Sequence, residues 1–355
     1  MKIAAAYAAA RMWSLFFLAL TLACVTLSLL VNPYRLLPIY VTIPGLNDVQ
    51  PALYYFPGPT RLFDLANRQF DTLIFGSSRV VYGIDPLSPH LRLYGKVYNS
   101  GLLGGQMLEI EKMSEHALAN QRHLRLVLLG IDIATFDKTQ EGRLLALNQE
   151  YGKSSRELFR VYGGLVLDLR AVGEAIVSSA LRRDARSFRL DGLGIPDPLA
   201  APQAYPEILN KPSGPRAIAP YARFEPSQAM LAAFSRMIDR YRQRHIEVRV
   251  FLTPAQFHFR GSTAERIRRE IAQVIPYWDF DYPNSVTDEP ELFIGAGHFS
   301  TRVGDLILAR VLSGTGAAVP ADFGAYVTQH DIEQHLQRIE ERFERAEPST
   351  EQQLP

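Results

Sequence analysis

One uncharged apolar stretch near the N-terminus limits this chain more than any other feature. From Met12 to Val31 the sequence reads MWSLFFLALTLACVTLSLLV, about twenty residues without a charge. An α-helix rises about 1.5 Å per residue, so this stretch matches a bilayer core of roughly 30 Å. We therefore predict a transmembrane anchor at residues 12–31, preceded by a short segment at residues 1–11.

The charges that flank this stretch predict its orientation. Lys2 and Arg11 precede it, and no acidic residue does. Basic residues are retained on the cytoplasmic side of a membrane. We expect residues 1–11 to be cytoplasmic and the main part of the chain to be periplasmic or extracellular.

Two alternatives to a permanent anchor are a cleaved signal peptide and a lipoprotein signal. A signal peptide has an apolar core of about 7–15 residues, and the run here is longer. Leu20 to Cys24 faintly matches a lipoprotein signal, but Val25 to Val31 stays apolar after the cysteine. We therefore favour an anchor that is not cleaved.

Composition excludes several classes of function. Lys and Arg number 38 against 37 Asp and Glu, a net charge of +1, which argues against nucleic-acid binding. Cys24 is the single cysteine, so neither an intramolecular disulfide nor a cysteine-based metal site can form. The eight histidines are scattered, and no phosphate-binding or dinucleotide-binding glycine motif is present. We expect no cofactor and no metal.

Apolar runs that end in glycine alternate with helical patterns. Asp71 to Phe75 runs into Gly76-Ser77-Ser78-Arg79, and Leu124 to Leu129 runs into Gly130-Ile131-Asp132. Continuous apolar runs are typical of parallel strands covered on both faces. We predict an α/β fold with three layers (α/β/α, flavodoxin-like) and a parallel sheet of about five strands, preceded by one transmembrane helix.

The same patterns suggest the domain boundaries. Repeated prolines make residues 32–70 a juxtamembrane connector without long regular elements. The α/β domain covers residues 71–315 and carries an irregular, proline-rich insertion at about 138–225. Residues 316–355 form a charged, amphipathic C-terminal tail.

Three loops carry residues that could do chemistry. In an open α/β sheet, ligands bind beyond the carboxyl ends of the strands. Ser78 follows the first strand as a candidate nucleophile, and His298 precedes the last helix as a candidate base. Asn99 and the glycine loop that contains Gly104 could stabilise an oxyanion. The plainer alternative is that Ser77 and Ser78 only cap a helix.

This order of motifs resembles the SGNH (GDSL-like) hydrolase superfamily over about residues 71–313. It is most similar to the membrane-anchored members of bacterial envelopes, such as alginate O-acetyltransferase-type proteins and D-alanyl transfer proteins. The resemblance implies that Ser78 is the nucleophile and His298 the general base. It also implies that the backbone N–H groups of Ser78 and of Gly104, or Gly101 in a shifted register, stabilise the oxyanion.

Two positions depart from the pattern of the superfamily. Asp132 stands where an oxyanion-stabilising Asn is usual, and Gly295 stands where the acid of the triad is usual. Asp288, Glu289 or Glu291 could replace that acid, Asp132 could be recruited, or the enzyme could use a Ser-His dyad. Losing the acid of a triad can cost about 10⁴ in turnover.

The resemblance suggests two functions. The first is serine-dependent acyl transfer or ester hydrolysis on a cell-envelope or exported polysaccharide, beside a membrane acyl-transfer or export partner. The alternative is a catalytically inactive scaffold or glycan-binding protein with the same fold. Both place the chain in the bacterial inner (cell) membrane, with the bilayer as a partner through residues 12–31.

Overall fold

The chain divides into two compact units in the computed structural model. The structure describes residues 2–37, 40–55, 57–138, 152–181, 187–189, 191–195, 225–294, 297–314 and 318–346. The first unit contains Met1–Asn67 and Ser154–Phe188, and the second contains Arg68–Lys153 and Arg189–Pro355.

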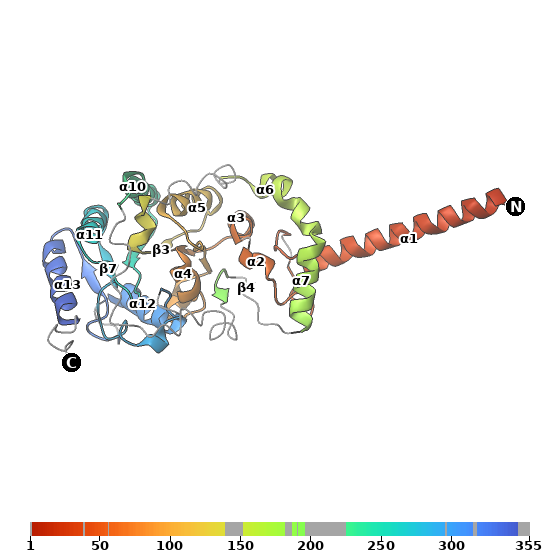
Figure 1. Cartoon of the computed structure of the whole chain (residues 1–355). Coiled ribbons are helices and arrows are strands. Elements are labelled where there is room, and N and C mark those ends of the chain that lie inside the picture. Colours follow the sequence, from red (N-terminus) through yellow and green to blue (C-terminus); the bar gives the residue numbers. More distant parts are fainter. Residues whose placement is uncertain are drawn as a thin grey trace, which may run out of the picture. The chain divides into compact units, whose positions relative to one another are not determined.

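The first unit is mainly helical (Figure 1). Its principal elements are α1 (Lys2–Val31), α2 (Ala52–Tyr55), α3 (Pro57–Asn67), α6 (Ser155–Tyr162), the 3₁₀ helix η4 (Gly163–Leu167) and α7 (Leu169–Ala180). Within α1, Ala9–Val31 is long and apolar enough to cross a membrane. The chain is therefore compatible with a single-pass membrane protein.

This unit joins two regions that the sequence analysis separated. Residues 32–67 of the connector and α6 and α7 of the predicted insertion belong to the same compact unit. The connector also contains α3, an 11-residue helix where we expected no long element. Its two prolines, Pro57 and Pro59, lie in the first turn, where a helix does not need their missing N–H groups. Residues 139–151, 182–186, 190 and 196–224 of the insertion lie outside the described residues.

The second unit is built on a six-stranded sheet with the order β2-β1-β3-β6-β7-β8. The strands are β1 (Thr72–Gly76), β2 (Val97–Asn99), β3 (Leu126–Ile131), β6 (Glu247–Leu252), β7 (Tyr277–Asp279) and β8 (Ala325–Val327). The first five in the order are parallel, and β8 pairs antiparallel with β7. The predicted α/β fold is confirmed, and the C-terminal tail adds a sixth strand that we did not expect.

Helices cover both faces of this sheet (Figure 1). They are α4 (Ser78–Gly83), η1 (Pro89–Tyr94), α5 (Met107–Asn120), α10 (Gln228–Gln243), α11 (Ser262–Val274), α12 (Thr301–Ser313) and α13 (Ile332–Ala346). Helices α5 and α10 pack together on one face, and α12 packs with α4 and η1 on the other. The arrangement is consistent with a three-layer α/β/α fold.

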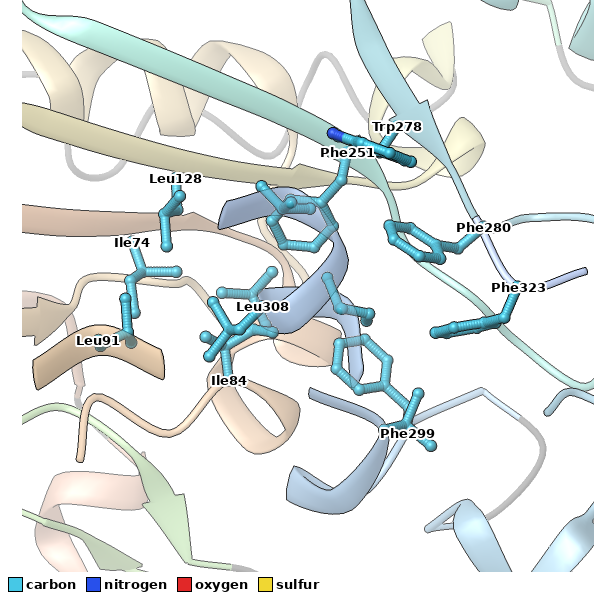
Figure 2. Close-up of a cluster of buried hydrophobic side chains, with 14 of the residues drawn as sticks. Ile74, Ile84, Leu91, Leu128, Phe251, Trp278, Phe280, Phe299, Leu308 and Phe323 are labelled. Carbon is cyan, nitrogen blue, oxygen red and sulfur yellow. The ribbon is translucent and has the colours of Figure 1, made fainter. Parts of the chain in front are cut away.

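The core on the α12 face fixes the position of the candidate site. Figure 2 shows Ile74, Leu128 and Phe251 of the strands pointing toward Leu308 of α12 and toward Phe299. All five side chains are buried. Because Phe299 follows His298 directly, the core anchors the loop that carries the candidate base.

Candidate active site

The candidate site lies where β1 and β3 end. The five parallel strands run in the flavodoxin-like order, and the chain turns to opposite sides of β1 when it forms β2 and β3. In open α/β sheets, ligands bind at such a switch point, beyond the carboxyl ends of the strands. Ser78 follows β1 there, and Asp132 follows β3.

Two glycines let α4 begin directly on these strand ends. A Cβ atom on Gly76 would lie 2.2 Å from the carbonyl oxygen of Gly130 and 2.4 Å from Val80 Cγ2. A Cβ atom on Gly130 would lie 2.5 Å from the same Val80 methyl group. No side chain larger than hydrogen fits at either position. The glycines therefore hold Ser78, the first residue of α4, close to the edge of the sheet.

The structure brings Ser78 and His298 together across 220 positions of sequence. Ser78 Oγ lies 2.9 Å from His298 Nε2, which is hydrogen-bond distance. Both residues are partly exposed. This is the contact that the order of the motifs predicted, and it is the geometry of a nucleophile and its base.

A close crossing of α4 and α12 makes this contact. A Cβ atom on Gly304 of α12 would lie 1.8 Å from the carbonyl oxygen of Gly83 in α4. A Cβ atom on Gly83 would lie 2.0 Å from the ring of Phe299. The loop before α12 is also held by a 2.7 Å hydrogen bond from Ile294 N–H to the carbonyl oxygen of His298. Small residues at the crossing therefore place the imidazole beside α4.

The surroundings of His298 keep its ring neutral. Burial lowers the pKa of His298 to about 4, and the positive charge of Arg79 acts in the same direction. The negative charge of Asp132 opposes both. The ring of Tyr82 meets the imidazole edge-on, with 5.5 Å between centroids. At neutral pH the imidazole is unprotonated, so it can accept a proton from Ser78.

Asp132 has partners that balance its charge. Ser77 Oγ donates a 2.7 Å hydrogen bond to Asp132 Oδ2, and Arg79 Nε lies 4.0 Å from the same oxygen. Arg79 Nη1 donates to Thr253 Oγ1 at 3.2 Å, and its guanidinium lies 5.3 Å from the ring centroid of Phe257. Arg79 was not among the candidate residues predicted from the sequence, although it directly follows the candidate nucleophile.

The structure places the candidate orienting acids in different surroundings. Asp288 and Glu291 are exposed, and Asp288 lines a surface pocket of about 660 Å³. Asp132 is the candidate whose charge acts on His298. Among the described residues, His298 forms a ring hydrogen bond only through Nε2, so none of these acids is hydrogen-bonded to its Nδ1. Gly295, the usual position of the acid, lies outside the described residues.

Asn99 is used for structure and does not supply an oxyanion donor. Its Nδ2 donates to the carbonyl oxygens of Val80 at 2.8 Å and Ile84 at 2.9 Å. Its Oδ1 accepts from the N–H of Gly101 at 3.0 Å. The expectation for its side chain was therefore wrong, because the amide already holds α4 to the glycine loop.

The two backbone donors expected for the oxyanion remain candidates. Within the part of the chain that the structure describes, neither the N–H of Ser78 nor that of Gly104 donates a recorded hydrogen bond. Gly104 is exposed, with a φ of +65° that favours glycine. Leu102 N–H donates to the carbonyl oxygen of Gly76 at 2.8 Å, which ties this loop to the end of β1.

Comparison with known proteins gives no assignment. No family model matches the chain, and no curated protein matches its sequence. Within the described ranges, no group of three or more His, Cys, Asp or Glu side chains could hold a metal ion. The functional argument therefore rests on the geometry of the site.

Proposed function

We propose that this protein is a membrane-anchored extracytoplasmic enzyme that transfers or hydrolyses an acyl ester through Ser78. The observation that carries the proposal is the 2.9 Å contact between Ser78 Oγ and His298 Nε2 at the carboxyl ends of the strands. A serine hydroxyl is a weak nucleophile until an adjacent base takes its proton. A neutral imidazole is such a base.

The proposed reaction has two halves. Ser78 Oγ attacks the acyl carbonyl carbon while His298 Nε2 takes the hydroxyl proton. The tetrahedral intermediate collapses, the ester C–O bond breaks, and the leaving alcohol takes that proton from His298. Water or an acceptor hydroxyl then attacks the acyl-serine, giving its proton to His298 as it attacks. When the C–O bond to Ser78 breaks, His298 returns the proton to Ser78.

The charge balance around Asp132 supports this chemistry. An unpaired carboxylate beside the nucleophile would repel the oxyanion of the tetrahedral intermediate. Here the hydroxyl group of Ser77 and the guanidinium of Arg79 face that carboxylate. We therefore expect the backbone N–H groups of Ser78 and Gly104 to act as the oxyanion donors.

The location of the domain supports the choice of acceptor. An anchor at α1 with a cytoplasmic N-terminus would hold the second unit outside the cell membrane. Hydroxyl groups of a cell-envelope or exported polysaccharide are abundant acceptors there. We propose such a polysaccharide as the substrate, next to membrane machinery that supplies the acyl group or exports the glycan.

Loss of the two central side chains tests the enzyme directly. The full chain in detergent or nanodiscs is assayed with a short acyl ester. Ser78→Ala and His298→Ala should each lower turnover by at least about 10³-fold. Ser285→Ala, at an exposed serine outside the site, should retain full turnover. Turnover that survives in both site variants would contradict the roles proposed for Ser78 and His298.

A second measurement separates an enzyme from an inactive scaffold that binds glycan. A short ester with a labelled acyl group is incubated with an exported polysaccharide and with either the wild-type chain or Ser78→Ala. Acyl transfer predicts label in the polysaccharide and a labelled serine peptide, both of which Ser78→Ala lacks. Glycan binding that is equal in both proteins, without any change in the label, would favour the scaffold.

A further inference from the structure

We propose that η4 and α7 of the first unit lie in the membrane–water interface and bind the lipid bilayer alongside α1. The surface consists of four exposed apolar side chains, Leu167, Leu169, Val177 and Leu181, which we call the apolar ridge. The proposal rests on α1 crossing a membrane and is independent of the acyl-transfer reaction.

The last turns of α1 are covered by the unit to which α1 belongs. Ser28 and Val31 are fully buried, and Cys24 and Val25 are partly covered. Helix α7 and η4 pack against α1 in this unit. Earlier in the helix the apolar side chains are exposed, as Leu22 is.

The covered turns lie inside the stretch that is long enough to span a membrane. That stretch runs from Ala9 to Val31, so Cys24 to Val31 is its last third. At about 1.5 Å per residue, these turns extend about 10 Å along the helix axis. Interfacial helices bury their apolar faces about 5–10 Å into the boundary between headgroups and acyl chains. Elements that pack against Cys24–Val31 therefore lie at the depth of the interface.

Side-chain hydrogen bonds fix α1 and α7 to the same segment. Asn47 Nδ2 donates to the carbonyl oxygen of Leu30 at 3.0 Å, and Gln50 Nε2 donates to that of Val31 at 2.9 Å. These carbonyls end a helix and lack intrahelical partners. Val49 N–H donates to Ser179 Oγ of α7 at 3.0 Å. Residues 47–50 thus connect the end of α1 to α7, so the depth of one determines that of the other.

Helix α7 has apolar residues on two opposite faces. Val172 and Ala175 are buried in a cluster with Val31. On the other side Leu169, Val177 and Leu181 are 58%, 46% and 60% exposed. Leu181 directly follows the last residue of α7, and the three positions recur at multiples of four residues on one side of the helix. Arg170 and Glu174 lie on the same side, so the three apolar side chains share it with one ion pair.

The position of the apolar ridge identifies its occupant. Figure 1 shows α7 crossing the C-terminal end of α1, as a helix lying in the plane of a membrane would cross a helix that spans it. Leu167, the last residue of η4, lies two residues before Leu169 and is 51% exposed. The polar neighbours Arg170 and Glu174 form an ion pair at 2.9 Å. An apolar row at interfacial depth with its charges paired fits a lipid surface.

Site-specific fluorescence in lipid tests the proposal. Cys24→Ser provides a full-length chain without cysteine, into which Val177→Cys or Leu181→Cys is introduced and labelled with the environment-sensitive fluorophore NBD. Gln337→Cys, on an exposed face of α13, is the matched control. Each protein is reconstituted into phosphatidylcholine vesicles with and without lipids that carry a quenching doxyl group near the headgroup.

We expect NBD at positions 177 and 181 to emit at shorter wavelength and to be quenched several-fold more than NBD at position 337. Quenching at positions 177 and 181 that is no stronger than at position 337 would overturn the proposal. A blue shift at 177 and 181 without quenching by the doxyl lipids would also overturn it, because protein would then cover the apolar ridge.

Discussion

Two regions of the second unit place histidines in opposite surroundings. At the end of β7, His335 Nε2 lies 2.9 Å from Asp279 Oδ2, and His258 Nδ1 lies 3.2 Å from Asp281 Oδ1. At the candidate site, His298 contacts a serine and has no carboxylate partner among the described residues. Histidine side chains are thus paired with an acid at the end of β7, whereas the histidine of the candidate site is not.

The region at the end of β7 is a fully buried network. Arg268 Nε donates to Asp279 Oδ2 at 2.8 Å, and its Nη2 donates to Asp281 Oδ2 at 3.3 Å. Burial raises the pKa of Asp279, but the charge of Arg268 and the contact with His335 together lower it to about 2. The network joins α11 and α13 to the sheet. Its carboxylates therefore serve the packing of the C-terminal helix.

The two regions differ in what their histidines do. In the β7 network, the carboxylates beside the histidines hold helices in place. At the candidate site, burial and Arg79 keep His298 neutral, which is the state a base needs.

The largest effect is expected from Arg268→Met. Removing one partner of a buried ion pair leaves uncompensated charge and costs about 3–5 kcal/mol of the free energy of unfolding. Asp279, with a lowered folded pKa, contributes stability that is present above its unfolded pKa of about 4 and is lost as the pH falls toward 2. Denaturant unfolding at several pH values measures both effects, and the variant should lose most of this pH dependence.

Arg269→Met on the same helix is the control. Arg269 pairs with Glu333 at the surface, at 2.8 Å, and exposed pairs contribute about 1 kcal/mol or less. An equal loss of stability in both variants would mean that the buried network is not what holds α13 to the sheet.

We expect Gly304→Ala to reduce stability less than Arg268→Met does, but to reduce activity more. The new Cβ would lie 1.8 Å from the carbonyl oxygen of Gly83, so α12 must move away from α4. Overpacking of this kind costs about 1–3 kcal/mol. Because the crossing sets the distance between Ser78 and His298, ester turnover should fall further than stability alone explains.

Gly173→Ala in α7 is the control for Gly304→Ala, because a Cβ atom at position 173 would meet nothing within 4 Å. It should leave turnover unchanged. Turnover of Gly304→Ala is measured at a temperature at which the variant is still folded. Full turnover there would show that the helix crossing does not position the candidate base.

The sequence predicted the local elements of this site better than their connections. Gly76-Ser77-Ser78 and His298 could be found because a glycine turn after a buried strand and a histidine before a helix are local patterns. The use of Asn99 to hold α4 could not be found, because it depends on which carbonyls the folded chain presents. The pairing of α7 with α1 depends on contacts between distant segments, such as the hydrogen bond between Val49 and Ser179, which are 130 positions apart.

The third prediction concerns the pH dependence of the wild-type protein. A histidine titrates near pH 6.5 when nothing shifts its pKa, and here burial lowers that of His298 to about 4. The acid limb of kcat/KM should therefore fall near pH 4, because this parameter reports the free enzyme. Between pH 6.5 and 4 the unfolded chain binds a proton that the folded chain does not, so the free energy of unfolding should fall as the pH falls. An acid limb near pH 6.5 would show that His298 is not the base or is fully solvated.

The smallest effect is expected from Asp132→Asn. An Asn side chain can still accept the hydrogen bond from Ser77, so the fold of the loop should persist. The lost negative charge raised the pKa of His298, so the acid limb of kcat/KM should move to lower pH, by less than about one unit. Asp288→Asn, at a carboxylate that lines the surface pocket, should leave the acid limb in place. A shift to higher pH in Asp132→Asn, or an equal shift in both variants, would mean that the charge of Asp132 does not act on the base in the way the geometry implies.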